Sequence, residues 1–314
     1  MIIAAQNKNI IDKLRSSSGG IFPLIAKKII GDGGIVYGAA FDETFNVKHI
    51  AVESFDELPK IYGSKYVFSD YAGTFKAIED DLQTGRKVLF SGLPCQVAGL
   101  HAYLKKDFQN LYVIDCICHG APSREVWNEY LRELSKGRKI KFVNFRSKKN
   151  GWVNYCLIVK FDDGTQYTVD HNKDPYMRGF IDNLTLREAC YHCKFKGTRN
   201  RQSDITLGDL WGAEELVPRL FDDKGTSLLI VNSKKGQMLL EIIKDEIVTD
   251  TIDEEKALSL NWAAIRTARP NIFKKQFERE YKKTGNLTGA LIKYGFPGVG
   301  LKVYRKILQI MKEK

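Results

Sequence analysis

The stretch RKVLFSGLPCQVAGLHAYLKKDFQNLYVIDCICHGAPS, residues 86–123, decides the fold. Two short apolar runs, residues 86–92 and 111–117, each end in a turn that opens a helix, so the stretch predicts two successive strand–turn–helix units. Each turn carries a cysteine, Cys95 in the first and Cys118 in the second. Because α/β proteins bind ligands where strands end and helices begin, we expect a functional site at these turns.

The segments on either side extend this pattern into an α/β fold of the mixed α+β kind. A turn rich in serine and glycine, residues 16–20, precedes an apolar helix, and strands are predicted over residues 35–41 and 46–53. Residues 139–170 read as a β meander. We expect three regions: an N-terminal α/β region (1–136), a β-rich region with a C-x-x-C segment (137–260) and a basic helical tail (261–314).

The composition is that of a soluble globular protein. The chain has 314 residues, of which 43% are hydrophobic, enough for one large or two ordinary domains. No apolar run is long enough to cross a bilayer, and the N-terminal residues lack the basic flank of a secretory signal. We therefore expect a cytoplasmic protein without stable membrane insertion, whose six cysteines are metal ligands or buried residues rather than disulfides.

The net charge of +11 invites comparison with nucleic-acid-binding proteins. Much of this charge lies in residues 264–314, and no zinc-finger, helix-turn-helix or RNA-recognition pattern accompanies it. We therefore expect no nucleic-acid partner, and we interpret most of these side chains as a solvated helical surface. The functional alternative is a docking surface for an acidic protein or an anionic ligand.

The cysteines fall into two groups. Cys116 and Cys156 lie within apolar strands and are expected in the core. The other four stand in turns beside glycine, proline or histidine, where a thiolate can reach a metal: Cys95, Cys118, Cys190 and Cys193. Four thiolates suit either a structural zinc ion or a 4Fe–4S cluster. Their origin in three distant segments weakens the zinc interpretation without excluding it.

Several polar features have both a structural and a functional interpretation. His119 is a metal ligand, a proton donor, a hydrogen-bond partner of the sulfurs or simply a helix cap. Asp204 and Asp209 flank a predicted buried strand and either bind a cofactor, orient basic residues or cap turns. The glycines of the 16–20 turn form an anion site at a helix start or a plain cap. Lys65 reaches a phosphate or is solvated.

The order of these motifs along the chain is specific, although each alone is weak. They are SSGG (17–20), GSKYV (63–67), LFSGLPCQVAGL (89–100), CHGAPS (118–123), FRSK (145–148) with GW (151–152), the C-x-x-C pair (190–193) and SDITLGDLW (203–211). This set closely resembles the coenzyme F420 hydrogenase/dehydrogenase beta-subunit family. The resemblance extends from about residue 16 to about residue 235, and the basic tail is not diagnostic.

The resemblance implies an oxidoreductase with FAD beside a 4Fe–4S cluster, which couples hydride transfer at the flavin to one-electron transfer through the cluster. The positions matching the cluster cysteines are Cys95, Cys118, Cys190 and Cys193. The positions implied near the cofactor are Ser18, Gly19, Gly20, Ser64, Lys65, Gln96, Trp152, Asp204 and Asp209. The catalytic candidates are His119, Arg146 and Lys148.

One departure from the family pattern bears on the partners. Many bacterial relatives carry an N-terminal ferredoxin module with a C-x-x-C-x-x-C run, which this sequence does not contain. We therefore expect a separate ferredoxin or another iron–sulfur carrier as the one-electron partner, and a deazaflavin or nicotinamide as the hydride donor or acceptor. A helix is expected over residues 299–312, with Leu301, Tyr304, Leu308 and Met311 on one face. It packs back on the domain, docks a partner or lies on an anionic membrane, and its short apolar face suits the membrane least. The hypothesis for a partner is an acidic ferredoxin.

The alternative hypothesis is a non-catalytic family member. In that case zinc or a cluster serves only stability, and the protein is a scaffold in a biosynthetic complex, for example one that makes polysaccharide. The colour of the purified protein separates the two hypotheses, because flavin and iron–sulfur clusters absorb visible light and zinc does not.

Overall fold

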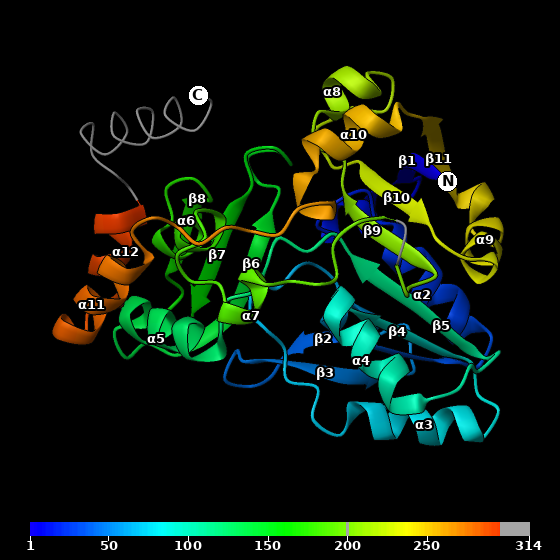
Figure 1. Cartoon of the computed structure of the whole chain (residues 1–314), viewed down its shortest axis with the longest axis horizontal. Helices are drawn as coiled ribbons and strands as arrows, with labels where there is room; N and C mark the ends of the chain where they lie inside the picture. Colours follow the sequence, from blue (N-terminus) through cyan, green and yellow to red (C-terminus); the bar gives the residue numbers. More distant parts are fainter. Residues whose placement is uncertain (199–200, 296–314) are drawn as a thin grey trace.

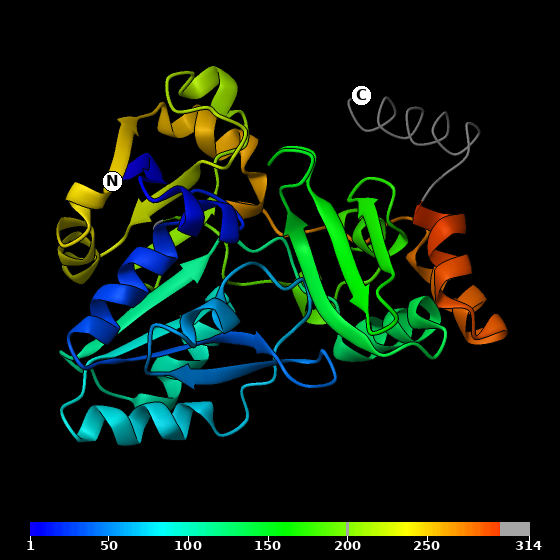
Figure 2. The same cartoon turned by 180° about the vertical axis from the view of Figure 1, so that it is seen from behind.

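The computed structural model describes residues 1–198 and 201–295, which form two lobes (Figure 1). The sheet lobe is built on an eight-stranded sheet. The small lobe is built on a three-stranded sheet, and it contains helices from the middle and from the C-terminal part of the chain (Figures 1 and 2). The predicted mixed α/β fold is confirmed.

The large sheet has the strand order β11-β1-β10-β9-β5-β4-β2-β3. Its middle is parallel, because β2, β4, β5 and β9 run in one direction, and the remaining neighbours pair antiparallel. The strands are β1 (Ile2–Asn7), β2 (Ile35–Phe41), β3 (Val47–Val52), β4 (Val88–Gly92), β5 (Leu111–Cys116), β9 (Ile205–Asp209), β10 (Ser227–Val231) and β11 (Ile247–Thr251).

Helices cover both faces of this sheet. On one face α2 (Ile21–Gly31) buries Ile21, Ile25 and Ile29, whose spacing of four residues keeps them on one side of the helix. On the other face α3 (Thr74–Gln83) and α4 (Pro94–Leu104) pack against the strands. The shorter helices are α1 (Ile10–Arg15), α8 (Ala213–Leu216), α9 (Lys234–Glu241), α10 (Glu254–Leu260) and the 3-10 turns Leu58–Ile61, Lys244–Glu246 and Trp262–Ala264.

The small lobe has its own aromatic core, centred on Trp127, Phe145 and Tyr176, which are all at most 1% exposed. Its sheet has the order β6-β7-β8, as the meander predicted. The elements are β6 (Ile140–Ser147), β7 (Cys156–Phe161), β8 (Gln166–Asp170), α5 (Arg124–Ser135), α6 (Pro175–Ile181), α7 (Glu188–Tyr191), α11 (Lys274–Thr284) and α12 (Leu287–Gly295).

The two lobes do not follow the three contiguous regions expected from the sequence, 1–136, 137–260 and 261–314. Strands β9, β10 and β11 return to the sheet of β1, far beyond residue 136. Helix α12 packs in the small lobe, where Leu287 and Leu291 are fully buried and the carboxylate of Glu133 accepts the N–H groups of Leu287 and Thr288, at 2.7 Å each. The start of the basic tail is therefore core. The candidate docking helix over residues 299–312 lies outside the described residues.

Most local elements lie where the sequence places them, and the exceptions are two strands of the large sheet that pair over long distances. Strands β1 and β11 were not predicted, because their short apolar runs acquire strand identity only through pairing with β10 and with each other.

None of the helices within residues 1–198 and 201–295 is long and apolar enough to cross a bilayer.

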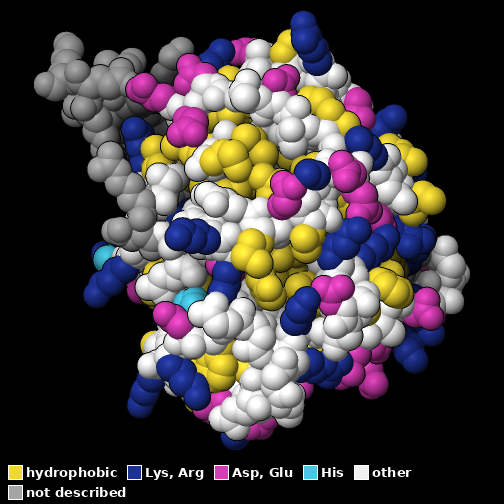
Figure 3. All heavy atoms as spheres, turned by 90° about the vertical axis from the view of Figure 1, so that its right-hand side faces the viewer, with side chains coloured by type: hydrophobic (Ala, Val, Ile, Leu, Met, Phe, Trp, Pro, Cys, Tyr) yellow, Lys and Arg dark blue, Asp and Glu magenta, His cyan; other side chains and the backbone are white. Residues whose placement is uncertain are grey.

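On the face of the molecule shown in Figure 3, lysine and arginine side chains are interspersed with aspartate and glutamate.

Candidate functional site

One edge of the large sheet gathers most of the predicted site residues. The turn with Cys95 follows β4, the loop with Cys118 follows β5, and Asp209 ends β9. Because these strands are parallel, their carboxyl ends meet at this edge. Strand β1 runs the same way as β9, being antiparallel to β10, so the serine–glycine turn after it reaches the same edge.

The four predicted cluster cysteines converge at this edge. A short antiparallel bridge between Pro122 and Leu186 lays the segment before the C-x-x-C pair along the Cys118 loop. The Arg187 N–H donates to the Ala121 carbonyl at 3.0 Å, and Cys190 Sγ lies 3.9 Å from the same oxygen. Local pairing thus holds the two distant segments together.

The thiols influence one another electrostatically. Partial burial raises the pKa of the Cys95 thiol, and the nearby Cys193 and Cys190 raise it further. Burial raises the pKa of Cys118 well above its usual value, with further contributions from Cys116, Cys95 and Cys190. All four predicted ligands therefore lie within electrostatic reach of their neighbours.

The other two cysteines differ in position. Cys156 is 1% exposed within β7 and belongs to the core, as expected. Cys116 was expected in the core but is only partly buried at the end of β5. Burial, with Asp115 beside it, raises the pKa of the Cys116 thiol to about 12, and Cys95 contributes to this shift. Cys116 is thus a fifth thiol of the same neighbourhood.

The donor set suits an iron–sulfur cluster chemically, since thiolates are its protein ligands. Within residues 1–198 and 201–295, no group of three His, Cys, Asp or Glu side chains stands close enough to hold a single metal ion. The raised pKa values of Cys95 and Cys118 mean that metal binding would displace their protons. The case for an iron–sulfur cluster at this site therefore rests on two observations. The candidate ligands are thiols, and they lie near one another.

His119 follows Cys118 and lies between aromatic rings. Its centroid is 5.0 Å from that of Phe180 and 5.1 Å from that of Trp262. Its Nε2 is 2.6 Å from Asn183 Oδ1, and burial lowers the pKa of the imidazole. The interpretation of His119 as a helix cap is excluded, because Ser123 caps α5.

The basic residues after the C-x-x-C pair mostly bind protein atoms. Lys196 Nζ donates to the carbonyls of Cys118 and Ala263. Arg201 forms a buried ion pair with Asp115, at 3.2 Å. These two cations therefore fix the loops around the thiols, and Arg199 lies outside the described residues.

The serine–glycine turn opens α2 at the same edge. Gly20 is the N-cap with φ of 81°, no side chain caps the helix, and both glycines of the turn are buried. A buried helix start without a side-chain cap suits an anion. The glycines themselves are explained by packing, because a Cβ on Gly19 would clash with the Ala5 carbonyl oxygen and one on Gly20 would lie 3.0 Å from Lys13 Cα. Substituting either glycine thus tests folding rather than ligand approach.

Arg146 is the buried cation of this half of the site. Its guanidinium is 3.1 Å from the carboxylate of Asp209 and donates to the Ser17 carbonyl at 3.3 Å and to the Tyr66 hydroxyl at 3.4 Å. It also lies over the Tyr155 ring, 3.9 Å from its centroid. Burial opposes the charged form, but Asp209 and the tyrosines raise the pKa of Arg146 above its usual value. The guanidinium is therefore a permanent charge.

Trp152 and Asp209 belong to the same cluster. The Trp152 Nε1–H donates to Asp209 at 3.2 Å, and the ring stacks on Trp211 with centroids 5.4 Å apart and planes 8° apart. Trp152 is 1% exposed, whereas Trp211 is only partly buried. Trp211 is therefore the ring of this pair with the greater access to solvent.

Two predicted residues have their polar groups occupied within the protein. Lys148 Nζ donates to the carbonyls of Lys13, Ser18 and Lys224, which uses all three of its protons. Gln96 caps α4 through the Leu93 N–H and binds Ser69 Oγ. Both side chains therefore support the site from behind rather than face a ligand directly.

Asp204 lies away from the other site residues. It precedes β9, at the opposite end of that strand from Asp209. Its carboxylate accepts the Val113 N–H at 2.8 Å and the Ser233 hydroxyl at 2.6 Å. The structure therefore does not bring Asp204 together with the remaining candidates, and its contacts are those of a structural residue.

The remaining predicted residues lie beside the serine–glycine turn. The Ser64 N–H donates to Ser17 Oγ at 2.6 Å, and Ser18 Oγ donates to the Thr226 carbonyl at 2.8 Å. Lys65 Nζ donates to the carbonyls of Tyr62 and Gly63, and burial lowers the pKa of this amine to about 7. The loop of Ser64 and Lys65 is thus joined directly to the start of α2.

Sequence reasoning missed four residues at this edge. Ser17, Tyr66 and Trp211 lie inside the recognised motifs but were not selected. The fourth, His49 on β3, has no sequence signal, since a single histidine in an apolar strand is ordinarily a core residue. It is 8% exposed and bonds to Ser91 and Ser69.

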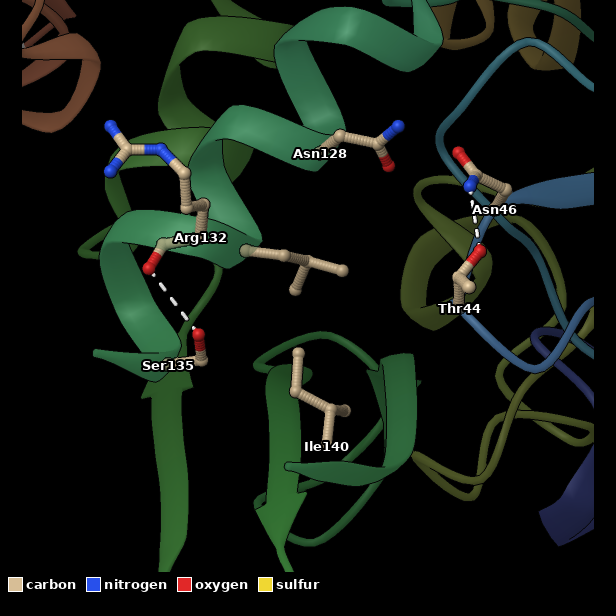
Figure 4. A pocket seen from close by; sticks show the side chains of 7 residues that line it. Thr44, Asn46, Asn128, Arg132, Ser135 and Ile140 are labelled. Atoms are coloured by element: carbon tan, nitrogen blue, oxygen red, sulfur yellow. Dashed lines mark hydrogen bonds between the residues drawn. The ribbon is translucent and has the colours of Figure 1, made fainter. Parts of the chain in front are cut away.

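A separate cavity of about 330 Å³ contains none of the predicted residues. It lies between the β2–β3 hairpin and α5, and Figure 4 shows Thr44 and Asn46 on one side of it and Asn128 and Arg132 of α5 on the other. The predicted chemistry is therefore not in this cavity.

Comparison with known proteins agrees with this fold. A chain of the F420-reducing NiFe hydrogenase complex from Methanosarcina barkeri is similar in structure, with a TM-score of 0.57 and 16% sequence identity, over 91% of this chain and 93% of that one. No curated protein sequence matches. The family model for the C terminus of the coenzyme F420 hydrogenase/dehydrogenase beta subunit matches residues 85–256, more than half of the 314 residues. The chain therefore belongs to the coenzyme F420 hydrogenase/dehydrogenase beta-subunit family.

Proposed function

We propose that this protein is an oxidoreductase that couples hydride transfer at FAD to one-electron transfer through a 4Fe–4S cluster. The observation that carries the proposal is the convergence, at one sheet edge, of two chemically different halves. One half contains Cys95, Cys118, Cys190 and Cys193, and the other contains the start of α2 and the buried Arg146.

In this proposal the four thiols hold the cluster. A bound cluster would supply one-electron chemistry at this place. The chain's own residues set its surroundings: Lys196 fixes the backbone at Cys118, and the Arg201–Asp115 pair fixes the loop after the C-x-x-C pair. Cys116 is a spare thiol beside the four ligands.

The other half would hold the flavin. A buried helix start without a side-chain cap and the nearby amine of Lys65 suit the negative phosphates. The permanent charge of Arg146 and the partly buried ring of Trp211 suit the polar edge and the face of an aromatic ring system. Lys148 acts indirectly, by holding the serine–glycine turn.

A chain of contacts joins the halves. Tyr66, which bonds to Arg146, stacks on Phe180 with centroids 4.6 Å apart, and Phe180 contacts His119 beside Cys118. Cofactors bound in the two halves would therefore be close neighbours, as electron transfer between them requires.

The proposed one-electron partner is an acidic ferredoxin or a similar iron–sulfur protein. Residues 262–272 lie against the C-x-x-C segment, since Thr267 Oγ1 donates to the Cys193 carbonyl at 3.1 Å. This segment exposes Trp262 and Ile265 together with Arg266 and Arg269. An apolar surface with basic residues beside the thiols suits an acidic partner, with electrostatic steering that salt would weaken.

The test is anaerobic purification followed by absorption spectra with candidate donors: reduced deazaflavin, NADPH, NADH and reduced ferredoxin. The expected result is bound flavin and iron, with bleaching of the flavin by a hydride donor and of the cluster absorption by ferredoxin. A colourless protein that contains zinc would overturn the proposal in favour of the scaffold.

A further inference from the structure

The turn that carries Cys95 is fastened from both sides to one histidine of another strand. On the upstream side, the Nε2–H of His49 donates to the Ser91 carbonyl at 3.0 Å. Ser91 lies in β4, directly before the turn. Because a carbonyl only accepts, this bond fixes the neutral tautomer of His49 that carries its proton on Nε2.

The downstream side is held by the other ring nitrogen. Ser69 Oγ donates to His49 Nδ1 at 3.1 Å and accepts from Gln96 Nε2 at 2.8 Å. Gln96, which directly follows Cys95, accepts the Leu93 N–H on its Oε1 at 2.9 Å. The hydrogen bonds thus run from one end of the turn to the other through the imidazole.

The surroundings of His49 keep this arrangement rigid. The ring packs on Phe90 with centroids 5.3 Å apart and planes 23° apart, and Tyr71 contacts it edge-on. Burial lowers the pKa of His49 to about 4, and Lys65 contributes to the shift. The ring is therefore neutral at ordinary pH, so Nδ1 remains an acceptor for the Ser69 hydroxyl.

We propose that His49 is a positioning residue, which fixes the turn so that the Cys95 thiol faces those of Cys190 and Cys193. That the aligned thiols bind a cluster rests on the proposed function. The position of the turn does not depend on a cofactor, because the hydrogen bonds that hold it are formed by residues of the chain itself. It can be measured without any cofactor.

The test compares His49→Phe with wild type in the cofactor-free protein. Phenylalanine keeps the packing on Phe90 and removes both hydrogen bonds of the ring. Alkylation by iodoacetamide, followed at each cysteine by peptide mass spectrometry, is expected to be about 3- to 10-fold faster at Cys95 and unchanged at Cys193. Cys95 is an exposed residue, but its thiol is partly buried, and a loosened turn frees the thiol from the groups that cover it. The matched control is His101→Phe on α4, whose ring nitrogen bonds to the Gln202 carbonyl.

A second variant guards against a folding defect. Gln96→Met keeps the length of the side chain and breaks the network downstream, so it should reproduce the faster alkylation of Cys95. Wild-type alkylation of Cys95 in both variants would overturn the proposal. An equal increase at all the cysteines would also overturn it, because it would indicate general loosening.

The iron–sulfur readout is separate. If the wild type reconstitutes a cluster, His49→Phe should change its electron paramagnetic resonance signal, and an unchanged signal would count against positioning. If the wild type binds no iron at all, the proposed function fails while the alkylation result stands, so the two failures are distinguishable.

Discussion

The thiol half of the site and the half proposed to hold a flavin, called the flavin half below, differ in how their side chains are used. In the thiol half, the four cysteines selected from the sequence lie within electrostatic reach of their neighbours, and all four are free cysteines. In the flavin half, Lys148 directs its amine to three backbone carbonyls of neighbouring segments. Free thiols that lie near one another seldom have a structural role, whereas a lysine amine often holds neighbouring segments together through hydrogen bonds.

The two halves also differ in how far their residues are organised before a ligand binds. Arg146 and Asp209 form a buried pair that exists without any ligand, so that half is organised in advance. No three of the thiols, in the part of the chain that the structure describes, are spaced to hold a single metal ion. We therefore expect binding at the thiols to adjust the loops, and binding at Arg146 to leave them in place.

The largest expected effect is in the thiol half. The double variant Cys190→Ser/Cys193→Ser should lose most of its bound iron, because a serine hydroxyl is a poor replacement for a thiolate ligand. Iron is measured per protein after anaerobic reconstitution. Cys156→Ser is the control, because this core residue should cost packing and retain iron. Full iron retention in the double variant would end the cluster assignment.

The next effect is in the flavin half. Arg146→Met should lower the free energy of unfolding by about 3–5 kcal/mol, because it leaves the carboxylate of Asp209 unpaired in a largely buried place. Urea denaturation measures it. Arg138→Met, which removes an arginine over the Phe161 ring at the surface, is the control and should cost far less. Equal losses of unfolding free energy for the two variants would show that Asp209 is solvated. That outcome would count against a flavin half that is organised before its ligand binds.

The sequence could predict the two strand–turn–helix units and single out the cysteines in their turns for physical reasons. The two strand–turn–helix units have strong local signals, and cysteines in turns are rare enough to be informative. It could not assign β1 and β11 or the two lobes, since these depend on pairing between residues more than two hundred positions apart. It also could not distinguish Asp204 from Asp209, because the sequence of a strand does not show which of its two ends lies at the site.

A pH dependence tests whether Lys65 is a ligand of an anion. Burial lowers the pKa of its amine from 10.5 to about 7, and only the charged ammonium attracts pyrophosphate. The affinity for pyrophosphate, measured by calorimetry, should therefore fall as pH rises from 7 to 9, by at most about tenfold per unit. Binding in that window should take up protons. Lys65→Met should bind more weakly and lose this pH dependence, whereas a dependence that survives would assign it to another group.

The smallest expected effect concerns the two aspartates that flank β9. Asp204→Asn should cost about 1 kcal/mol of stability, since the amide can still accept one of its two hydrogen bonds, and should leave flavin and iron contents at wild-type levels. Asp209→Asn should instead weaken flavin retention, because it removes the charge that pairs with Arg146. Flavin and iron are quantified in the same preparations, so each variant serves as the control for the other. If Asp204→Asn released flavin as readily as Asp209→Asn, then position along the strand would not decide function, and the assignment of the site to the carboxyl edge of the sheet would be wrong.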